Sequence, residues 1–93
     1  MEREKTISAI KGVLRRHRVR KAYLFGSFAR GEKRCRDIDI AIVPPSGKFS
    51  LLDLIGMEQE LEGKTGKKAD VSILRSIKPA LLPYISRDLT AII

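Results

Sequence analysis

The sequence predicts a single small α/β (α+β) domain over residues 1–93, built on a mixed three- to four-stranded sheet with helices packed on one face. Three observations lead to this prediction. A length of 93 residues suits one modest hydrophobic core. Stretches with helical periodicity alternate with stretches that have the period of a strand. One strand, residues 37–43, is apolar on one face and acidic on the other, so the sheet should have a buried and an open face.

The first helix is expected over residues 2–17, followed by a strand over residues 21–25. Apolar side chains recur in the helical segment at spacings of three and four, which is typical of a helix that buries one side. These side chains are Ile7, Ile10, Val13 and Leu14. The strand stops at Gly26, and a short helix should begin with Ser27 as its cap and run to about Gly31.

The second strand, residues 37–43, should lead through a proline-rich turn into another helix. Ser50 and Asp53 form a variant of the capping box at its start, and Gly63 with Gly66 should end it. We expect its apolar side to consist of Leu51, Leu54, Ile55 and Leu61, with Met57 as core filler.

The last part of the chain should add a strand over residues 68–74, a helix, and a short edge strand over residues 90–93. Pro79 is tolerated in the first turn of a helix, while Pro83 would either kink that helix or mark its true start. The side chains expected to face the sheet are Leu81, Leu82, Ile85 and Leu89. An apolar chain end left exposed would indicate a partner.

Two acids give the chain its first candidate site. Asp37 and Asp39 lie on one face of their strand, with Ile38, Ile40 and Ile42 on the other. Two carboxylates about 6 to 7 Å apart on a strand repel each other, and a cation makes the pair favourable. Oxygen ligands of this kind suit Mg²⁺, which is usually held by one or two carboxylates plus substrate phosphates. The pair is therefore a candidate metal site.

Gly26 and Ser27 are the candidate phosphate-binding residues. A glycine lets the backbone approach phosphate closely, a serine hydroxyl can donate, and the free N–H groups at a helix start favour an anion. We expect Arg30 either to contact phosphate or to anchor the following loop. Its alternative partners are Glu32 and a carboxylate of the acid pair.

These residues together resemble a known signature. Gly-Ser-Phe-Ala-Arg-Gly at residues 26–31, followed after a short loop by Asp-Ile-Asp-Ile at residues 37–40, is similar to the motif of the nucleotidyltransferases of the DNA polymerase β superfamily. Within it the chain most resembles the minimal nucleotidyltransferase (MNT) group, small proteins commonly paired with a HEPN-domain partner. The resemblance covers nearly the whole chain. Either short motif alone is weak, but their spacing behind a strand is specific.

Two features depart from that signature. The family usually has Ser immediately before the first Asp, where this chain has Arg36 preceded by Cys35. The loop between Ser27 and Asp37 holds nine residues, about one fewer than in many relatives. Either change could alter nucleotide affinity or choice, and neither removes a proposed ligand.

The resemblance implies an enzyme that moves a nucleoside monophosphate, AMP from ATP, to an acceptor hydroxyl. Asp70, the only acid of the third strand, matches the third carboxylate of the family, although its spacing alone also allows a surface residue. In the family role, Asp70 would join Asp37 and Asp39 in holding Mg²⁺ and would accept the proton of the attacking hydroxyl. A triphosphate with a charge of about −4 approaches three carboxylates only with roughly two divalent cations between them, so metal and nucleotide should bind together.

The resemblance also implies an acceptor, a tyrosine on a HEPN-type ribonuclease toxin, which would make this chain its antitoxin. The alternative is a non-catalytic binding module that neutralises its partner by masking. Nucleotide addition to RNA or to a small antibiotic is a third reading, for which the sequence offers no acceptor-binding surface.

A net charge of +8 suits a polyanionic partner, although a heavily charged soluble surface explains it as well. Nucleic acid is less favoured than nucleotide, because few aromatic side chains are free to stack on bases. The densest basic run, residues 15–21, complements a helix C-terminus, while some of its side chains could reach a phosphate or an acidic partner. Within this run, His17 is expected to be a surface or boundary residue at the helix end rather than a catalytic base.

A single cysteine, Cys35, cannot form an internal disulfide, which fits a reducing cytoplasm. The sequence contains no stretch of membrane-spanning length and no signal-peptide core. We therefore expect a cytoplasmic protein that does not engage a membrane. A homo-oligomer is compatible with these residues.

Overall fold

The computed structural model describes residues 3–31, 36–81, 83 and 86–93. Its strands form one four-stranded sheet in the order β3-β2-β1-β4. The strands are β1 (Lys21–Phe25), β2 (Asp37–Val43), β3 (Lys68–Ile73) and β4 (Thr90–Ala91). β1 pairs antiparallel with both β2 and β4, whereas β2 and β3 run parallel. The expected mixed sheet is confirmed.

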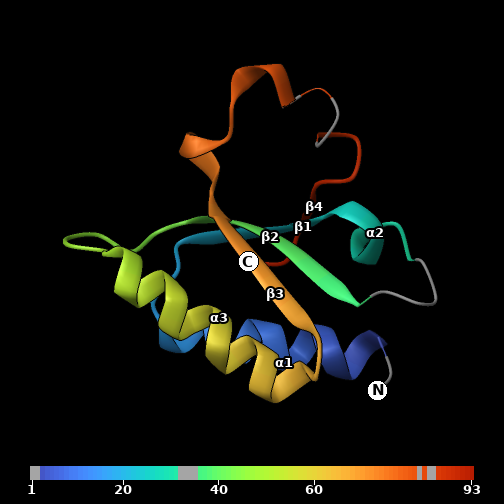
Figure 1. The fold of residues 1–93 in the computed structure, drawn as a ribbon, viewed down its shortest axis with the longest axis horizontal. Coiled ribbons are helices and arrows are strands. Elements are labelled where there is room, and N and C mark those ends of the chain that lie inside the picture. The colour runs from blue at the N-terminus through green and yellow to red at the C-terminus, as the bar shows by residue number, and fades with distance from the viewer. Residues whose placement is uncertain (1–2, 32–35, 82, 84–85) are drawn as a thin grey trace.

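Two helices, α1 (Arg3–Arg16) and α3 (Leu51–Thr65), lie side by side against the same face of the sheet (Figure 1). The core between them and the sheet is closed by fully buried aliphatic side chains from both layers. Among these are Ile10, Leu14, Ile38, Ile40, Ile42, Met57 and Leu61. The helices therefore cover one face, as expected, and the other face of the sheet remains available for a site.

The short helix α2 (Gly26–Ala29) begins one residue earlier than predicted and has a different cap. Phe25 occupies the cap position in an extended conformation, and no side chain bonds to the helix start. The prediction that Ser27 caps this helix is wrong, because the turn already begins at Gly26. The Ser27 hydroxyl is consequently not used for capping.

The capping box predicted at the start of α3 is confirmed. The Ser50 hydroxyl accepts from the Asp53 backbone N–H, and the Asp53 carboxylate accepts from the Ser50 backbone N–H. Gly66 ends the helix with a φ of 70°, while Gly63 lies inside it.

The predicted apolar side of α3 is wrong in its first turn. Leu51 is 70% exposed and Ile55 is 39% exposed. The buried line of the helix runs instead through Met57, Leu61 and Thr65, at intervals of four residues. The first turn lies at the end of the sheet, beside the β2–α3 connection, where no strand covers it (Figure 1).

The chain after β3 forms two short 3-10 helices, η1 (Leu74–Ser76) and η2 (Pro79–Leu81). Leu81 is 50% exposed, so the prediction that it faces the sheet is wrong. Leu82 and Ile85, to which the same prediction applied, lie outside the described residues. β4 confirms the short edge strand, and the two isoleucines that follow it are partly buried against the core rather than exposed. No helix in the described ranges has the length and apolar character needed to cross a membrane.

β3 is an edge strand of the sheet, and side chains of α3 accept hydrogen bonds from two of its outward N–H groups. The Glu58 carboxylate accepts from the Val71 N–H at 2.8 Å, and the Glu62 carboxylate accepts from the Ala69 N–H at 3.0 Å. These bonds block the edge against pairing with another strand and tie α3 to the strand that carries Asp70.

Glu58→Ala should lower the free energy of unfolding by about 1 to 3 kcal/mol, because it leaves the Val71 N–H without its acceptor. Glu58→Gln keeps an acceptor oxygen and should cost clearly less. Urea titration measures both variants, with Gln59→Ala as a control at an exposed position of the same helix. Equal losses for Glu58→Ala and Glu58→Gln would contradict the assignment of the effect to the hydrogen bond.

The end of α1 is joined to α3 by an ion-paired cluster. Glu60 pairs with Arg16 at 2.6 Å and with His17 at 2.9 Å. His17 is thus a partly exposed boundary residue just after the end of α1, as expected. The hydrogen bond to His17, and secondarily Arg16, hold the pKa of Glu60 below its ordinary value of 4.5, against the opposing effect of partial desolvation.

Because the pKa of Glu60 is lower in the folded chain than in the unfolded one, its stabilising contribution is present above about pH 4.5 and lost as the pH falls through the folded value. Glu60→Gln should therefore lower the melting temperature relative to wild type at about pH 7, and this difference should shrink as the pH falls through the lowered pKa of Glu60. The difference in free energy should stay below about 1 kcal/mol, since exposed ion pairs contribute little. A gap between the two proteins that persists in acid would contradict this expectation.

Candidate active site

The three predicted acids lie on the open face of the sheet. Asp37 and Asp39 alternate with fully buried isoleucines along β2. In the parallel pairing of β2 with β3, Asp39 stands beside Asp70, and Asp37 stands beside Lys68. Side chains at paired positions point to the same face of a sheet. The structure thus brings Asp39 and Asp70 together from two separate strands, with Asp37 next along β2.

The electrostatics of Asp39 reflect this arrangement. Partial burial raises the pKa of Asp39 above its ordinary value of 3.8, and the neighbouring carboxylates of Asp70 and Asp37 raise it further. Arg30 opposes these effects and lowers the pKa. Burial and neighbouring negative charge therefore make the ionised form of Asp39 less favourable than that of a free carboxyl group, and a positive charge at this place would stabilise it.

Gly26 forms the wall of the site beside Asp39. In the antiparallel pairing of β1 with β2, Phe25 stands opposite Asp39, so the chain turns at Gly26 directly next to the acid. A Cβ atom at Gly26 would lie 2.4 Å from Asp39 Oδ2, and the residue has a φ of +74°. Only glycine meets both conditions without a shift of its surroundings.

Arg3 of α1 binds the C-terminal end of the short helix α2, a contact that sequence reasoning missed. Its guanidinium donates to the carbonyl oxygens of Phe28 and Ala29 at the end of α2. It also lies 4.7 Å from the centre of the Phe28 ring, within the range of a cation–π contact. No local pattern signals this role, because Arg3 and Phe28 lie 25 positions apart.

Arg30, predicted to contact phosphate or anchor its loop, forms an ion pair with Asp88 at 2.8 Å. Asp88 stands just before β4, so the pair ties the end of α2 to the C-terminal segment. Asp88 was not among the expected partners. Glu32, which was, lies outside the described residues together with Lys33, Arg34 and Cys35.

The carboxylates fit a hard divalent cation by their chemistry, although they do not form a complete cage. Within the described ranges, no three His, Cys, Asp or Glu side chains are gathered so that they could hold a metal ion on their own. Oxygen donors of Asp37, Asp39 and Asp70 are spread over two strands at the open face. Such a donor set suits Mg²⁺, which commonly takes its remaining ligands from substrate phosphates and water.

Comparison with known proteins gives the family. Residues 8–93 match the family described as "Polymerase beta, Nucleotidyltransferase". The chain belongs to this nucleotidyltransferase family. It is 44% identical over 77 residues to a protein of Methanocaldococcus jannaschii provisionally named a protein adenylyltransferase, covering 82% of each chain.

Two solved structures of nucleotidyltransferases share its fold. One, provisionally described as a minimal nucleotidyltransferase, is 30% identical with a TM-score of 0.78 and covers 97% of this chain and 95% of its own. The other is a complex of a tri-AMPylated HEPN toxin with an MNT antitoxin from Shewanella oneidensis. Its matching chain is 21% identical with a TM-score of 0.77, covering 99% of this chain and 72% of its own. The resemblance to minimal nucleotidyltransferases and the enzyme class are confirmed, while the roles of individual residues stay predictions.

Proposed function

We propose that this nucleotidyltransferase moves AMP from ATP to a tyrosine hydroxyl of a HEPN-type partner in a Mg²⁺-dependent reaction, and so acts as the antitoxin of that partner. The observation that carries the proposal is the pairing of Asp39 with Asp70 across β2 and β3, with Gly26 against Asp39. Acids suited to a metal-bound nucleotide thus lie beside a backbone turn at a glycine, which supports the proposal.

The proposed site residues have two roles, one group binding the terminal phosphates and the other holding the metal ions. Gly26 and Ser27 bind the β and γ phosphates, and Arg30 adds positive charge on that side, near enough to Asp39 to lower its pKa. Asp37, Asp39 and Asp70 would hold two Mg²⁺ ions, which would supply positive charge for the triphosphate and the transition state.

Asp70 acts as the base of the proposed reaction. Its carboxylate accepts the proton of the acceptor hydroxyl. The hydroxyl oxygen forms a bond to the α-phosphorus while the bond from that phosphorus to the bridging oxygen of pyrophosphate breaks. Pyrophosphate leaves with the released electron pair, and the acceptor carries AMP.

The partner is supported by the Shewanella oneidensis complex, whose toxin is AMPylated and bound to an MNT chain of the same fold. The adenylyltransferase name of the Methanocaldococcus jannaschii relative supports a protein acceptor.

The test incubates the chain, Mg²⁺ and the purified product of the neighbouring reading frame with ATP labelled on either the α or the γ phosphate. We expect label on the partner from α-labelled ATP alone, and none when Asp37→Asn replaces the wild type. Label from γ-labelled ATP would indicate phosphate transfer and overturn the proposal. Neutralisation of the partner that survives Asp37→Asn without any label would establish masking by contact instead.

A further inference from the structure

A second surface lies at the other end of the sheet from α2. It surrounds the β2–α3 connection, the start of α3 and the two 3-10 helices that follow β3 (Figure 1). Along β2, Val43 at this end is four residues from Asp39, about 13 Å at the rise of a strand. None of the residues assigned to catalysis lies here.

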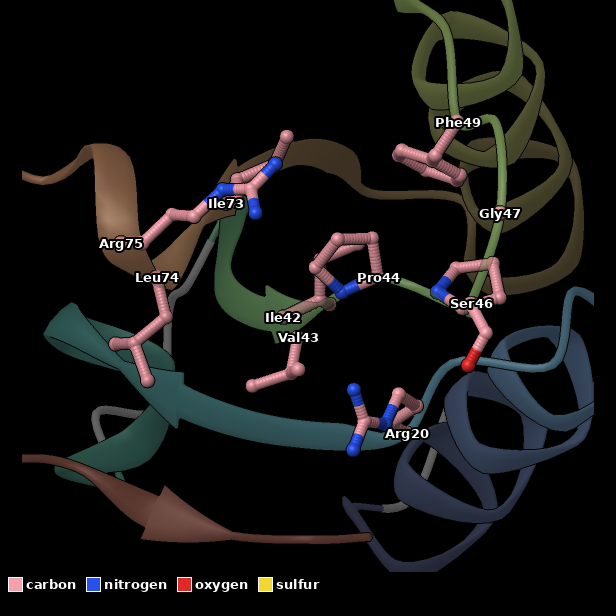
Figure 2. A pocket seen from close by; sticks show the side chains of 11 residues that line it. Arg20, Ile42, Val43, Pro44, Ser46, Gly47, Phe49, Ile73, Leu74 and Arg75 are labelled. Carbon is pink, nitrogen blue, oxygen red and sulfur yellow. The ribbon is translucent and has the colours of Figure 1, made fainter.

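A cavity of about 460 Å³ forms the basic part of this surface. Arg20, just before β1, and Arg75, in η1, reach it from opposite sides, with Val43 and Pro44 between them (Figure 2). Neither guanidinium forms an ion pair with any residue that the structure describes. Phe49 adds an apolar wall. The cavity therefore offers two positive charges above an apolar floor.

An apolar part adjoins this cavity. A second cavity, of about 460 Å³, contains Leu54, Leu81 and the cation Lys78, and Ile73 lines both cavities. The large hydrophobic side chains that are exposed within the described ranges all belong to α3 near this point or to η2. They are Leu51 at 70%, Leu52 at 79%, Ile55 at 39% and Leu81 at 50%. A gathering of exposed aliphatic side chains marks an interaction site.

We call these residues together the basic apolar face: Arg20, Arg75, Lys78, Leu51, Leu52, Ile55 and Leu81. We propose that this face docks an acidic, apolar segment of the protein partner. The proposal rests on the proposed function only for the choice of that partner. Docking here leaves the open face of the sheet free and holds the acceptor on the same small domain that carries the nucleotide.

The chemistry of the face decides between occupants. The two arginines have no ion pair with a described residue, and carboxylates of a partner would supply one. The exposed leucines would pack against apolar side chains of the same partner. A second copy of this chain is disfavoured, because a chain of net charge +8 would bring like charges together at this face. Single-stranded nucleic acid binds on aromatic platforms, whereas the basic apolar face has no aromatic member and its basic cavity is lined by one aromatic residue, Phe49.

The experiment measures the Kd for the purified product of the neighbouring reading frame by calorimetry, with every variant carrying Asp37→Asn so that no transfer occurs. Arg20→Glu with Arg75→Glu should weaken binding by at least about tenfold, and Leu52→Ser by roughly tenfold. The matched control, Arg15→Glu with Lys64→Glu, makes the same change of net charge at exposed positions off the face and should alter the Kd less than about threefold. Gln59→Ser is the control for Leu52→Ser.

Equal weakening by both charge-reversed doubles would overturn the proposal, since overall charge alone would then explain binding. So would an unchanged Kd in the Arg20 and Arg75 double, or no binding of the partner to Asp37→Asn. Fluorescent single-stranded RNA is titrated against the same proteins. If the Arg20→Glu, Arg75→Glu variant loses affinity for RNA but keeps its affinity for the partner, the proposal is overturned. Because binding is measured without transfer, failure of the proposed chemistry and failure of this docking face are separate results.

Discussion

Asp39→Asn is expected to lower AMP transfer roughly a thousandfold while leaving the fold intact. Asn keeps the size of the side chain but removes the negative charge from the centre of the acid group, between Asp37 along β2 and Asp70 across from it. If charge stabilisation at this point supplies about 4 kcal/mol in the transition state, its loss corresponds to that factor. Single-turnover transfer from α-labelled ATP at saturating Mg²⁺ measures the effect.

The matched control for this substitution is Asp53→Asn, which makes the same chemical change in an exposed cap of α3. Transfer by that variant should stay within about twofold of wild type, since its effect is confined to surface stability. Transfer by Asp39→Asn that stays within about tenfold of wild type would remove Asp39 from the proposed machinery. Circular dichroism of both variants establishes that neither result reflects unfolding.

The acid pair and the buried isoleucines on the opposite face of β2 were predictable because they depend on local geometry alone. Consecutive side chains of a strand point to opposite faces, so Asp37 and Asp39 had to share one face whatever the strand pairs with. The capping box of Ser50 and Asp53 is local in the same way. Both features depend on residues three or fewer positions apart, although such closeness did not suffice at α2, where the predicted Ser27 cap was wrong.

Features that depend on strand pairing or on distant residues did not follow from spacing. Asp70 lies 31 positions after Asp39, and only the parallel register of β3 places it beside that acid. Arg30 meets Asp88 across 58 positions. For Asp70 the resemblance to a family provided the missing information, whereas no pattern in the sequence pointed to Asp88.

The exposed start of α3 illustrates a different limit. Periodicity tells which residues of a helix are apolar, but it does not tell where the sheet beneath the helix ends. Leu51 and Ile55 belong to an apolar stripe by spacing and are exposed because they lie beyond the buried line through Met57 and Leu61. The unpredicted exposure of these apolar side chains is one of the observations that identify the basic apolar face.

Gly26→Ala is expected to lower AMP transfer about a hundredfold, because it forces the Asp39 carboxylate to move. The added Cβ would lie 2.4 Å from Asp39 Oδ2, where ordinary contacts begin near 3.4 Å, so the carboxylate must shift by about 1 Å. A displacement of about 1 Å in a reacting group can lower a rate by roughly a hundredfold. The unfavourable φ of +74° should also reduce the free energy of unfolding by about 1 to 2 kcal/mol. Labelled transfer and urea titration measure the two effects separately.

Gly66→Ala separates the loss of transfer from the strain of the backbone. Gly66 has a similar φ of +70°, and a Cβ atom there would meet nothing within 4 Å. Its substitution should therefore cost a similar free energy of unfolding and leave transfer unchanged. If both variants lose transfer to the same extent, reduced stability explains the result and contact with Asp39 does not. If only Gly26→Ala loses transfer, the reaction requires a residue without a side chain at position 26, so that the Asp39 carboxylate keeps its place.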